Sequence, residues 1–127
     1  MIQLLTQVAT AYNTLSASLF EPIIADDFVY ESQHVFEPMV GKNNFMEYIT
    51  GKFKTIQKTG ATIFAELGCS DSDNINCIIL AQGHKEKKVA LLFITLNAAG
   101  KIQNMEMCTI APNWRTAKRS NVYPGLA

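Results

Sequence analysis

A long apolar stretch in the second half of the chain constrains the fold more than any other feature. Residues 89–96 (VALLFITL) are mostly β-branched or large and apolar, which is typical of a strand covered on both faces. Gly100 follows in a short connection and can supply the positive φ that a tight turn needs. Residues 101–110 then alternate, with Met105 and Met107 on the same face. This stretch therefore predicts a long β-hairpin whose first arm needs cover on both sides.

Strand alternation divides the first arm of this hairpin into two apolar faces. One face carries Ala90, Leu92, Ile94 and Leu96, and the other carries Val89, Leu91 and Phe93. If the Leu92 face turns toward the interior, the opposite face needs a cover of its own. A partner subunit would cover it, which predicts a homodimer. The alternative is that the C-terminal tail folds over it.

The rest of the chain places helices early and strands late. Leucines and other apolar residues at three- and four-residue spacing predict an amphipathic helix from the start to about residue 18. A short second helix with Pro22 in its first turn, a strand from Phe28 and a helix from about Gly41 to Gly60 follow. Further strands are expected at 61–67 and 75–82, before the hairpin. This order predicts an α+β fold with helices on one face of a curved antiparallel sheet.

Two local features of the middle helix lead to narrower expectations. Asn43 or Asn44 is expected to cap its N-terminus. Gly51 lies inside the helical pattern, where a glycine costs about 1 kcal/mol relative to alanine. It suggests either a break in the helix or a close approach to another backbone.

Length, charge and cysteine content narrow the class of protein. A chain of 127 residues suits one domain. Eleven basic and eleven acidic residues give zero formal net charge, which argues against nucleic-acid binding because phosphate recognition relies on a positive field. Three cysteines, with no C-x-x-C pair, suggest reduced thiols and a cytoplasmic location. No stretch approaches 18 consecutive apolar residues, so no membrane span is expected.

Three motifs, taken in order, carry a resemblance to a known superfamily. They are residues 24–32 (IADDFVYES), Gly41-Lys42 at the start of a helix, and residues 97–102 (NAAGKI). This order resembles the nuclear-transport-factor-2-like superfamily, in particular its SnoaL-like, polyketide-cyclase-like and ketosteroid-isomerase-like members. The resemblance implies a cone-shaped, cystatin-like α+β domain over residues 1–111. The resemblance also implies a pocket between the helices and the sheet, and dimers joined through the outer sheet face. Residues 112–127 hold Arg115, Lys118 and Arg119 and no acid, and they are expected to form a basic C-terminal tail.

The same resemblance indicates which catalytic groups of the isomerase type are missing. Isomerases of this superfamily place a basic carboxylate at the position of Ser32 and a protonated acid at the position of Leu92. A tyrosine on the first helix completes their site, and Tyr12 is the nearest match. Serine is a poor proton-abstracting base near neutral pH, and leucine cannot donate a hydrogen bond to an enolate oxygen. Steroid-isomerase chemistry is therefore not expected.

Residues from separate elements are expected to line the pocket. The predicted ligand-binding residues are Tyr12, Tyr30, Ser32, His34, Tyr48, Leu92, Met105 and Met107. Alternation on the first strand turns Tyr30, Ser32 and His34 to the same side. His34, oriented by Glu37, is a candidate general acid or base, and the alternative is that these polar tips lie solvated at the rim of the sheet. No metal-ligand spacing stands out, so neither a metal nor a cofactor is predicted.

These features favour a protein that binds or turns over a small apolar or aromatic molecule. The alternative is a non-catalytic dimeric scaffold that binds another protein through the sheet face or the tail. An open cavity with ordered polar groups at Tyr30, Ser32 and His34 would favour the first function. A cone filled by Phe45, Tyr48, Phe53 and Met107 would favour the second.

Overall fold

The computed structural model describes residues 1–33, 37–109 and 117–126. The elements are α1 (Ile2–Thr14), the 3-10 helix η1 (Ala17–Phe20), β1 (Ile24–Ser32), β2 (Met39–Val40), α2 (Lys42–Thr59), β3 (Ile63–Cys69), β4 (Cys77–Gln82), β5 (Lys88–Leu96), β6 (Ile102–Cys108) and β7 (Lys118–Arg119). The predicted α+β fold is confirmed, as is the order of helices followed by strands. No helix in the described part of the chain combines the length and hydropathy that a membrane crossing needs.

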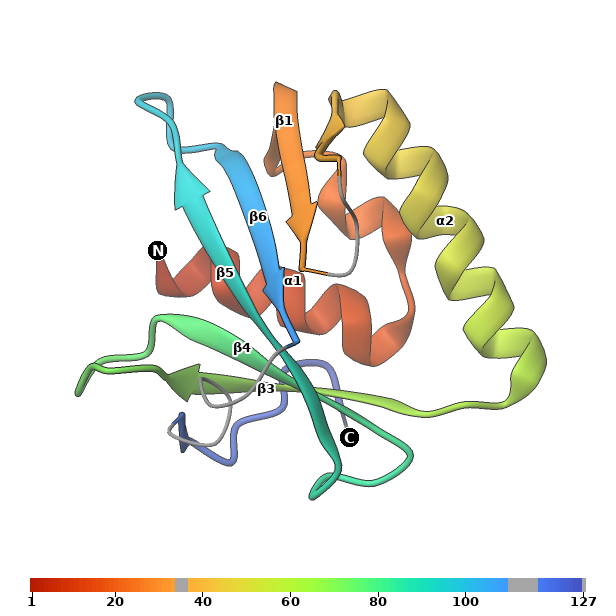
Figure 1. Cartoon of the computed structure of the whole chain (residues 1–127), viewed down its shortest axis with the longest axis vertical. Helices are drawn as coiled ribbons and strands as arrows, with labels where there is room; N and C mark the ends of the chain where they lie inside the picture. Colours follow the sequence, from red (N-terminus) through yellow and green to blue (C-terminus); the bar gives the residue numbers. More distant parts are fainter. Residues whose placement is uncertain (34–36, 110–116, 127) are drawn as a thin grey trace.

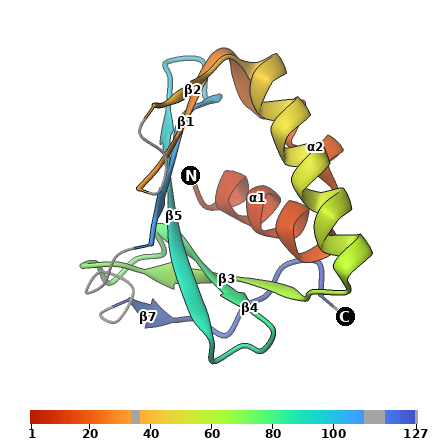
Figure 2. The ribbon, with the colours of Figure 1, turned by 45° about the vertical axis from the view of Figure 1, so that its right-hand side comes forward.

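The strands form one bent sheet in the order β2-β1-β6-β5-β4-β3-β7. Figures 1 and 2 show that the sheet curves around α1 and that α2 closes the open side of this curve. The sheet is mixed rather than purely antiparallel, because β1 pairs with β6 in parallel. Such a pairing needs a long connection between the two strands, and here α2 and the four strands β2, β3, β4 and β5 supply it.

The β5–β6 hairpin has the predicted form. Its turn is held by Asn97, whose side-chain Oδ1 accepts hydrogen bonds from the backbone N–H groups of Ala99 and Lys101, both at 3.0 Å. Gly100 adopts a φ of 81°, the left-handed conformation for which the turn requires a glycine. Next to the turn the register shifts between Thr95 and Leu96, which leaves Gln103 as an extra residue on β6.

The two faces of β5 carry two separate cores, as alternation predicts. Leu92 lies opposite Met107 and Ile94 opposite Met105, and all four side chains pack in the main core under the helices. Leu91 faces the other way, where it packs in a second cluster that includes Ile79, Phe93, Cys108 and Ala117.

The second cluster limits which residues of the outer sheet face a dimer interface could bury. Leu91 is fully buried within a single chain, so it has no surface left to lose in a dimer. Ala117, in the tail, belongs to the same cluster, which agrees with the alternative that the tail covers part of this face. Phe93 is half-buried and retains accessible surface.

The N-terminal helices differ from the prediction. α1 ends at Thr14 rather than near residue 18, because Leu15 adopts a left-handed conformation with φ 52° and ψ 42°. The second helical turn, η1, precedes Pro22 instead of containing it. Ile24 belongs to β1, where it pairs with Ile102 of β6. This long-range pairing overrides the local helical pattern.

α2 is continuous from Lys42 to Thr59, and Gly60 ends it in a left-handed conformation, as expected. The expected cap at Asn43 or Asn44 is wrong: Gly41 occupies the N-cap position, and the Asn44 amide instead donates to the carbonyl of Val40 at 2.9 Å. Gly51 neither breaks the helix nor approaches another backbone, since nothing lies within 4 Å of where its Cβ would be.

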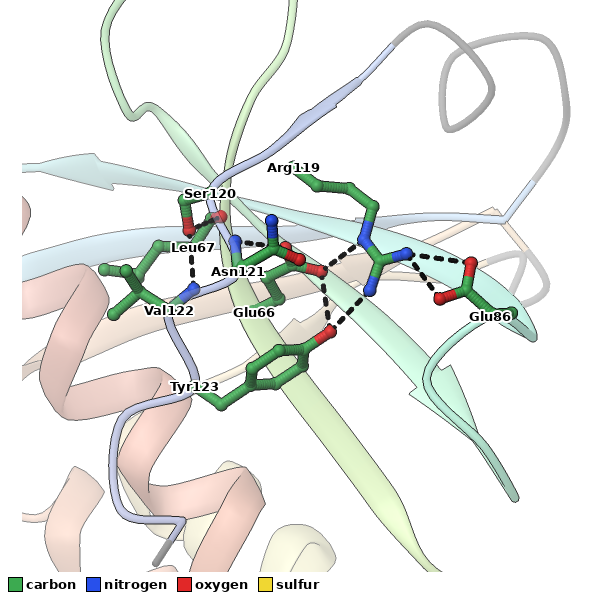
Figure 3. Close-up of polar contacts among 8 residues, drawn as sticks. All are labelled: Glu66, Leu67, Glu86, Arg119, Ser120, Asn121, Val122 and Tyr123. Carbon is green, nitrogen blue, oxygen red and sulfur yellow. Dashed lines mark hydrogen bonds and ion pairs between the residues drawn. The ribbon is translucent and has the colours of Figure 1, made fainter.

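Residues 117–126 pack against β3, held by a buried carboxylate (Figure 3). Glu66 of β3 is 2% exposed, and it accepts hydrogen bonds from Arg119 Nε (3.0 Å), the Tyr123 hydroxyl (3.0 Å) and the Asn121 backbone N–H (2.6 Å). Arg119 also donates two hydrogen bonds to Glu86, at 2.7 and 2.8 Å. We call Glu66, Glu86, Arg119 and Tyr123 the tail clasp.

Candidate functional site

The main cavity is a space of about 510 Å³ between the second half of α2 and the bent sheet. The residues that line it come from two helices, four strands and the segment after β6: Tyr12, Lys52, Thr55, Ile56, Ile63, Leu80, Gln82, Val89, Ala90, Met107 and Thr109. Its volume falls within the range of roughly 300–1,000 Å³ typical of small-molecule sites. The part of the cone near β3, β4 and β5 is therefore hollow.

The other part of the cone is filled by aromatic rings. Phe45 packs against Phe20, with ring centroids 5.2 Å apart, and against Phe28, at 4.8 Å. Tyr12 and Phe53 pack edge to face at 5.3 Å. The filling expected for the scaffold alternative is therefore partial: Phe45 and Phe53 fill their region, whereas Met107 lines the main cavity.

The main cavity has apolar walls and a few polar groups. Tyr12, Leu80, Ala90 and Met107 are buried and contribute apolar wall surface. Lys52 carries the only charge among the described lining residues. A cavity of this composition can bury an apolar body and orient it by a small number of hydrogen bonds.

Val89 does not follow the predicted alternation. It was expected to point outward with Leu91, yet it lines the main cavity beside Ala90. The pairing of β4 and β5 is irregular here: Leu80 lies opposite Ala90 and Ala81 opposite Lys88, which leaves Val89 as an extra residue on β5. A bulge of this kind resets the side-chain alternation and turns Val89 toward the cavity.

A second, smaller cavity of about 340 Å³ lies beside β1, and we call it the side cavity. Its lining comprises Tyr30, Ser32, Glu37, Pro38, Met39 and Tyr48. The Tyr30 hydroxyl donates a hydrogen bond to Met107 Sδ at 3.6 Å. Because Met107 lines the main cavity, this contact joins the walls of the two cavities.

The predicted site residues are thus divided between two cavities instead of converging on one. Tyr12 and Met107 line the main cavity. Tyr30, Ser32 and Tyr48 line the side cavity. Leu92 and Met105 lie on the expected face of the sheet but are fully buried in the core. His34, the candidate acid or base, lies outside the described residues.

Two tyrosines of this region remain protonated hydrogen-bond donors. Burial is the main cause that raises the pKa of Tyr12 well above its usual value, and the hydroxyls of Tyr30 and Tyr48 add to it. Burial also raises the pKa of Tyr30, with Tyr48 as the second cause. A neutral phenol can donate to an oxygen atom of a bound molecule.

The cysteines lie away from both cavities. Burial raises the pKa of the Cys77 thiol to about 12 and that of Cys108 to about 11. Thiols with such pKa values are poor nucleophiles near neutral pH. Within the described residues, no group of three His, Cys, Asp or Glu side chains could hold a metal ion.

The prediction from sequence missed Lys52, the charged residue of the main cavity. Tyr48, Lys52 and Ile56 follow one another at four-residue spacing and therefore lie along one ridge of α2. Lys52 Nζ donates to the Tyr48 hydroxyl at 3.4 Å and lies 5.7 Å from the centre of that ring. Its place between Tyr48 and Ile56 on the same helix face could have identified it.

Comparisons with solved structures find the same fold. A SnoaL-like protein of unknown function from Burkholderia thailandensis superposes with a TM-score of 0.63 at 11% identity, over 86% of this chain and 92% of that one. A proposed ketosteroid isomerase from Kribbella flavida gives 0.56 at 10% identity, covering 85% and 79% of the two chains. A nuclear-transport-factor-2-like protein of unknown function from Cytophaga hutchinsonii gives 0.51 at 14% identity, covering 78% and 80%.

The resemblance is thus confirmed at the level of fold. Other similar structures are described as having a cystatin-like fold, which is the fold predicted from the sequence. No protein-family model and no curated protein matches the sequence. Because these structures share little sequence identity with the chain, the likeness extends to the fold and not to a reaction.

Proposed function

We propose that this protein binds a small, largely apolar molecule in the main cavity. The observation that carries the proposal is the open space of about 510 Å³, whose walls are apolar and whose lining comes from six elements and the segment after β6. Because this space is open to solvent, its apolar walls lie against water. A bound molecule would displace that water and bury apolar surface, at about 25 cal/mol per Å² before binding costs are subtracted.

The fold supports the proposal in a general way. Similar folds are found among proteins described as a proposed isomerase, a proposed ketosteroid isomerase and a proposed polyketide cyclase. In this chain the described lining of the main cavity contains no carboxylate, so any proton transfer there would need a different base. Binding is therefore the proposal for the main cavity, and the carboxylate of this region, Glu37, lines the side cavity with Tyr30 and Ser32.

The test is a thermal-shift and calorimetric titration with neutral apolar and aromatic compounds. A compound that binds only the folded state raises the melting temperature as its concentration rises above Kd. Ala90→Phe should abolish the shift, because Ala90 is 2% exposed and lines the cavity, where a larger side chain would occupy the ligand's space. Ala98→Phe, in the exposed β5–β6 turn, makes the same change outside the cavity and should leave the shift intact.

A second variant keeps the test decisive if Ala90→Phe does not fold. Thr55→Trp would fill the main cavity from α2, where Thr55 is exposed enough for substitution without disturbing the core. Loss of binding in both cavity variants, with the Ala98 control unchanged, supports the proposal. Binding that survives both substitutions would place the site elsewhere and contradict it.

We also propose that the protein forms a homodimer through the outer sheet face. The half-buried Phe93 is the large apolar side chain of that face available for an interface, since Leu91 is already covered. Light scattering should give a dimer mass for the wild type and a monomer mass for Phe93→Glu. A monomeric wild type at micromolar concentration would contradict this proposal without affecting the one on binding.

A further inference from the structure

The main cavity combines an apolar body with a cationic edge. Its buried walls include Leu80, Ala90 and Met107, while Lys52 contributes the one charged side chain among the described lining residues. An apolar cavity without a charged group would not favour a charged compound over a neutral one of the same shape. The position of Lys52 therefore adds a requirement about charge to the requirement about shape.

Lys52 has no acidic partner among the described residues that would neutralise it. The described cations that form ion pairs are Lys42, Lys118 and Arg119, with Glu21, Asp73, Glu66 and Glu86 as their partners. Lys52 instead lies beside the Tyr48 ring and donates a long hydrogen bond of 3.4 Å to its hydroxyl. An ammonium group has three donors, so this contact leaves capacity for an anionic acceptor.

A second polar group in the same cavity lacks a partner. Thr109 Oγ1 is shielded from solvent and makes no hydrogen bond, although Thr109 lines the main cavity. A buried hydroxyl without a partner is costly, on the order of 1–3 kcal/mol. Because almost none of its surface is accessible, this hydroxyl is closed to a ligand in the cavity, and recognition of charge there rests on Lys52.

From these observations we infer that the main cavity selects apolar molecules that carry a carboxylate, with Lys52 as the residue that recognises the charge. This inference rests on the proposed binding function and adds the chemical class of the ligand. The hydrocarbon part fills the space between α2 and the sheet, and the carboxylate lies at the Lys52 edge. Charge-assisted hydrogen bonds between ammonium and carboxylate are stronger than neutral ones, so they favour the acid over an isosteric neutral compound.

The probes are biphenyl-4-carboxylate and biphenyl-4-carboxamide, which share one apolar body and differ in charge. Titration calorimetry on the full chain at neutral pH should show the acid binding roughly tenfold more tightly than the amide, which corresponds to about 1.4 kcal/mol. The preference should shrink as salt concentration rises, because salt screens the attraction at a partly exposed cation.

Variants of one helix separate charge recognition from packing. Lys52→Met keeps a long apolar side chain and should remove the preference for the acid, because it weakens binding of the acid more than binding of the amide. Lys52→Arg should retain the preference, since the charge remains. Lys54→Met, an exposed lysine of α2 that does not line the cavity, is the matched control and should bind both probes as the wild type does.

Each outcome has a defined meaning. Equal affinities for acid and amide in the wild type, or a preference that persists in Lys52→Met, would overturn the inference while leaving the proposed binding function standing. If Lys54→Met loses the preference as Lys52→Met does, the effect is one of general surface charge, and the inference is again wrong. If neither probe binds and the neutral compounds above also fail, both the inference and the proposed function are wrong.

Discussion

The Asn13 side chain pairs with both backbone polar groups of Ala65. Its Nδ2 donates to the Ala65 carbonyl at 2.8 Å, and its Oδ1 accepts from the Ala65 N–H at 2.7 Å. The same Nδ2 donates to the Pro124 carbonyl at 2.7 Å. One amide on α1 thus continues the hydrogen bonding of β3 and joins it to the tail.

We predict that Asn13→Ala lowers the free energy of unfolding by about 2 kcal/mol, because it leaves partly buried backbone groups without partners. Urea denaturation followed by circular dichroism measures the change. Gln3→Ala, at an exposed position of the same helix, should change stability by less than about 0.5 kcal/mol. If Asn13→Ala lowers the free energy of unfolding no more than Gln3→Ala does, water replaces the amide without cost and the prediction is wrong.

The tail clasp leads to a second prediction, since Glu66 is 2% exposed and depends on Arg119 for compensation of its charge. Arg119→Met should destabilise the protein by about 2 kcal/mol. The cost falls below that of breaking a fully buried pair, because the Tyr123 hydroxyl and the Asn121 N–H still donate to Glu66.

Lys118→Met is the matched control for this change. The neighbouring Lys118 pairs with Asp73 at 3.4 Å, with side chains 71% and 97% exposed. An ion pair as exposed as this one contributes little to stability. If Arg119→Met and Lys118→Met unfold at the same urea concentration, Arg119 does not stabilise the buried Glu66 carboxylate and the prediction is wrong.

Glu86 gives the clasp a dependence on pH. Hydrogen bonds from Arg119, together with its charge, hold the pKa of Glu86 below the ordinary value of 4.5. A carboxyl whose pKa is lower in the folded state contributes stability that is fully present above the unfolded pKa and is lost as pH falls through the folded one. Glu86→Gln should therefore melt at a lower temperature than the wild type at neutral pH, and the difference should disappear in acid.

Scanning calorimetry across this pH range measures the effect. Glu47→Gln, at an exposed position of α2, controls for the loss of one carboxylate. The opposite result is a difference in melting temperature between the wild type and Glu86→Gln that grows as the pH falls below 4.5. It would contradict a lowered pKa of Glu86 in the folded state.

Gly51 offers a stabilising substitution. It lies in the interior of α2, exposed, with nothing within 4 Å of a Cβ. Gly51→Ala should raise the free energy of unfolding by about 1 kcal/mol, because alanine loses less backbone entropy in a helix. Gly60→Ala should do the reverse, since Gly60 has a φ of 70° at the helix end. A destabilised Gly51→Ala would indicate that this position makes a contact in solution.

The sequence predicted the parts of the fold that local patterns determine. Residues 88–108 combine a two-faced apolar run with a turn that needs glycine, and they form the expected hairpin. Alternation correctly placed Leu92, Met105 and Met107 on the inner face. It failed at Val89, because a bulge depends on the register between two strands and leaves no mark in either one.

The sequence could not predict pairings between distant segments. Ile24 lies in a locally helical pattern but pairs with Ile102, 78 positions later, and the pairing determines its conformation. The tail clasp brings Glu66 and Arg119 together across 53 positions. An acidic residue within an apolar strand and an arginine in the tail were the available signals, and neither identifies its partner. Likewise, the contact between the Tyr30 hydroxyl and Met107 Sδ joins residues 77 positions apart, and neither residue identifies the other.

The last prediction concerns chemistry: we expect no steroid-type isomerase activity. The resemblance aligns Ser32 and Leu92 with the two carboxylate positions of such enzymes. In the structure Leu92 is fully buried in the core, and Ser32 lies in the side cavity. Neither side chain can act as a general base near neutral pH. A β,γ-unsaturated ketone incubated with the protein should therefore show no increase in the ultraviolet absorbance of the conjugated product above the rate in buffer.

Two variants make this result informative if activity is found. Glu37 is the one acid among the described residues that line the side cavity, so Glu37→Gln tests it as an unexpected base. Activity that Glu37→Gln abolishes would mean that a carboxylate from another position has replaced the missing one. Activity that Ser32→Ala abolishes would mean that the serine takes part in proton transfer, and the assignment of the two positions would be wrong.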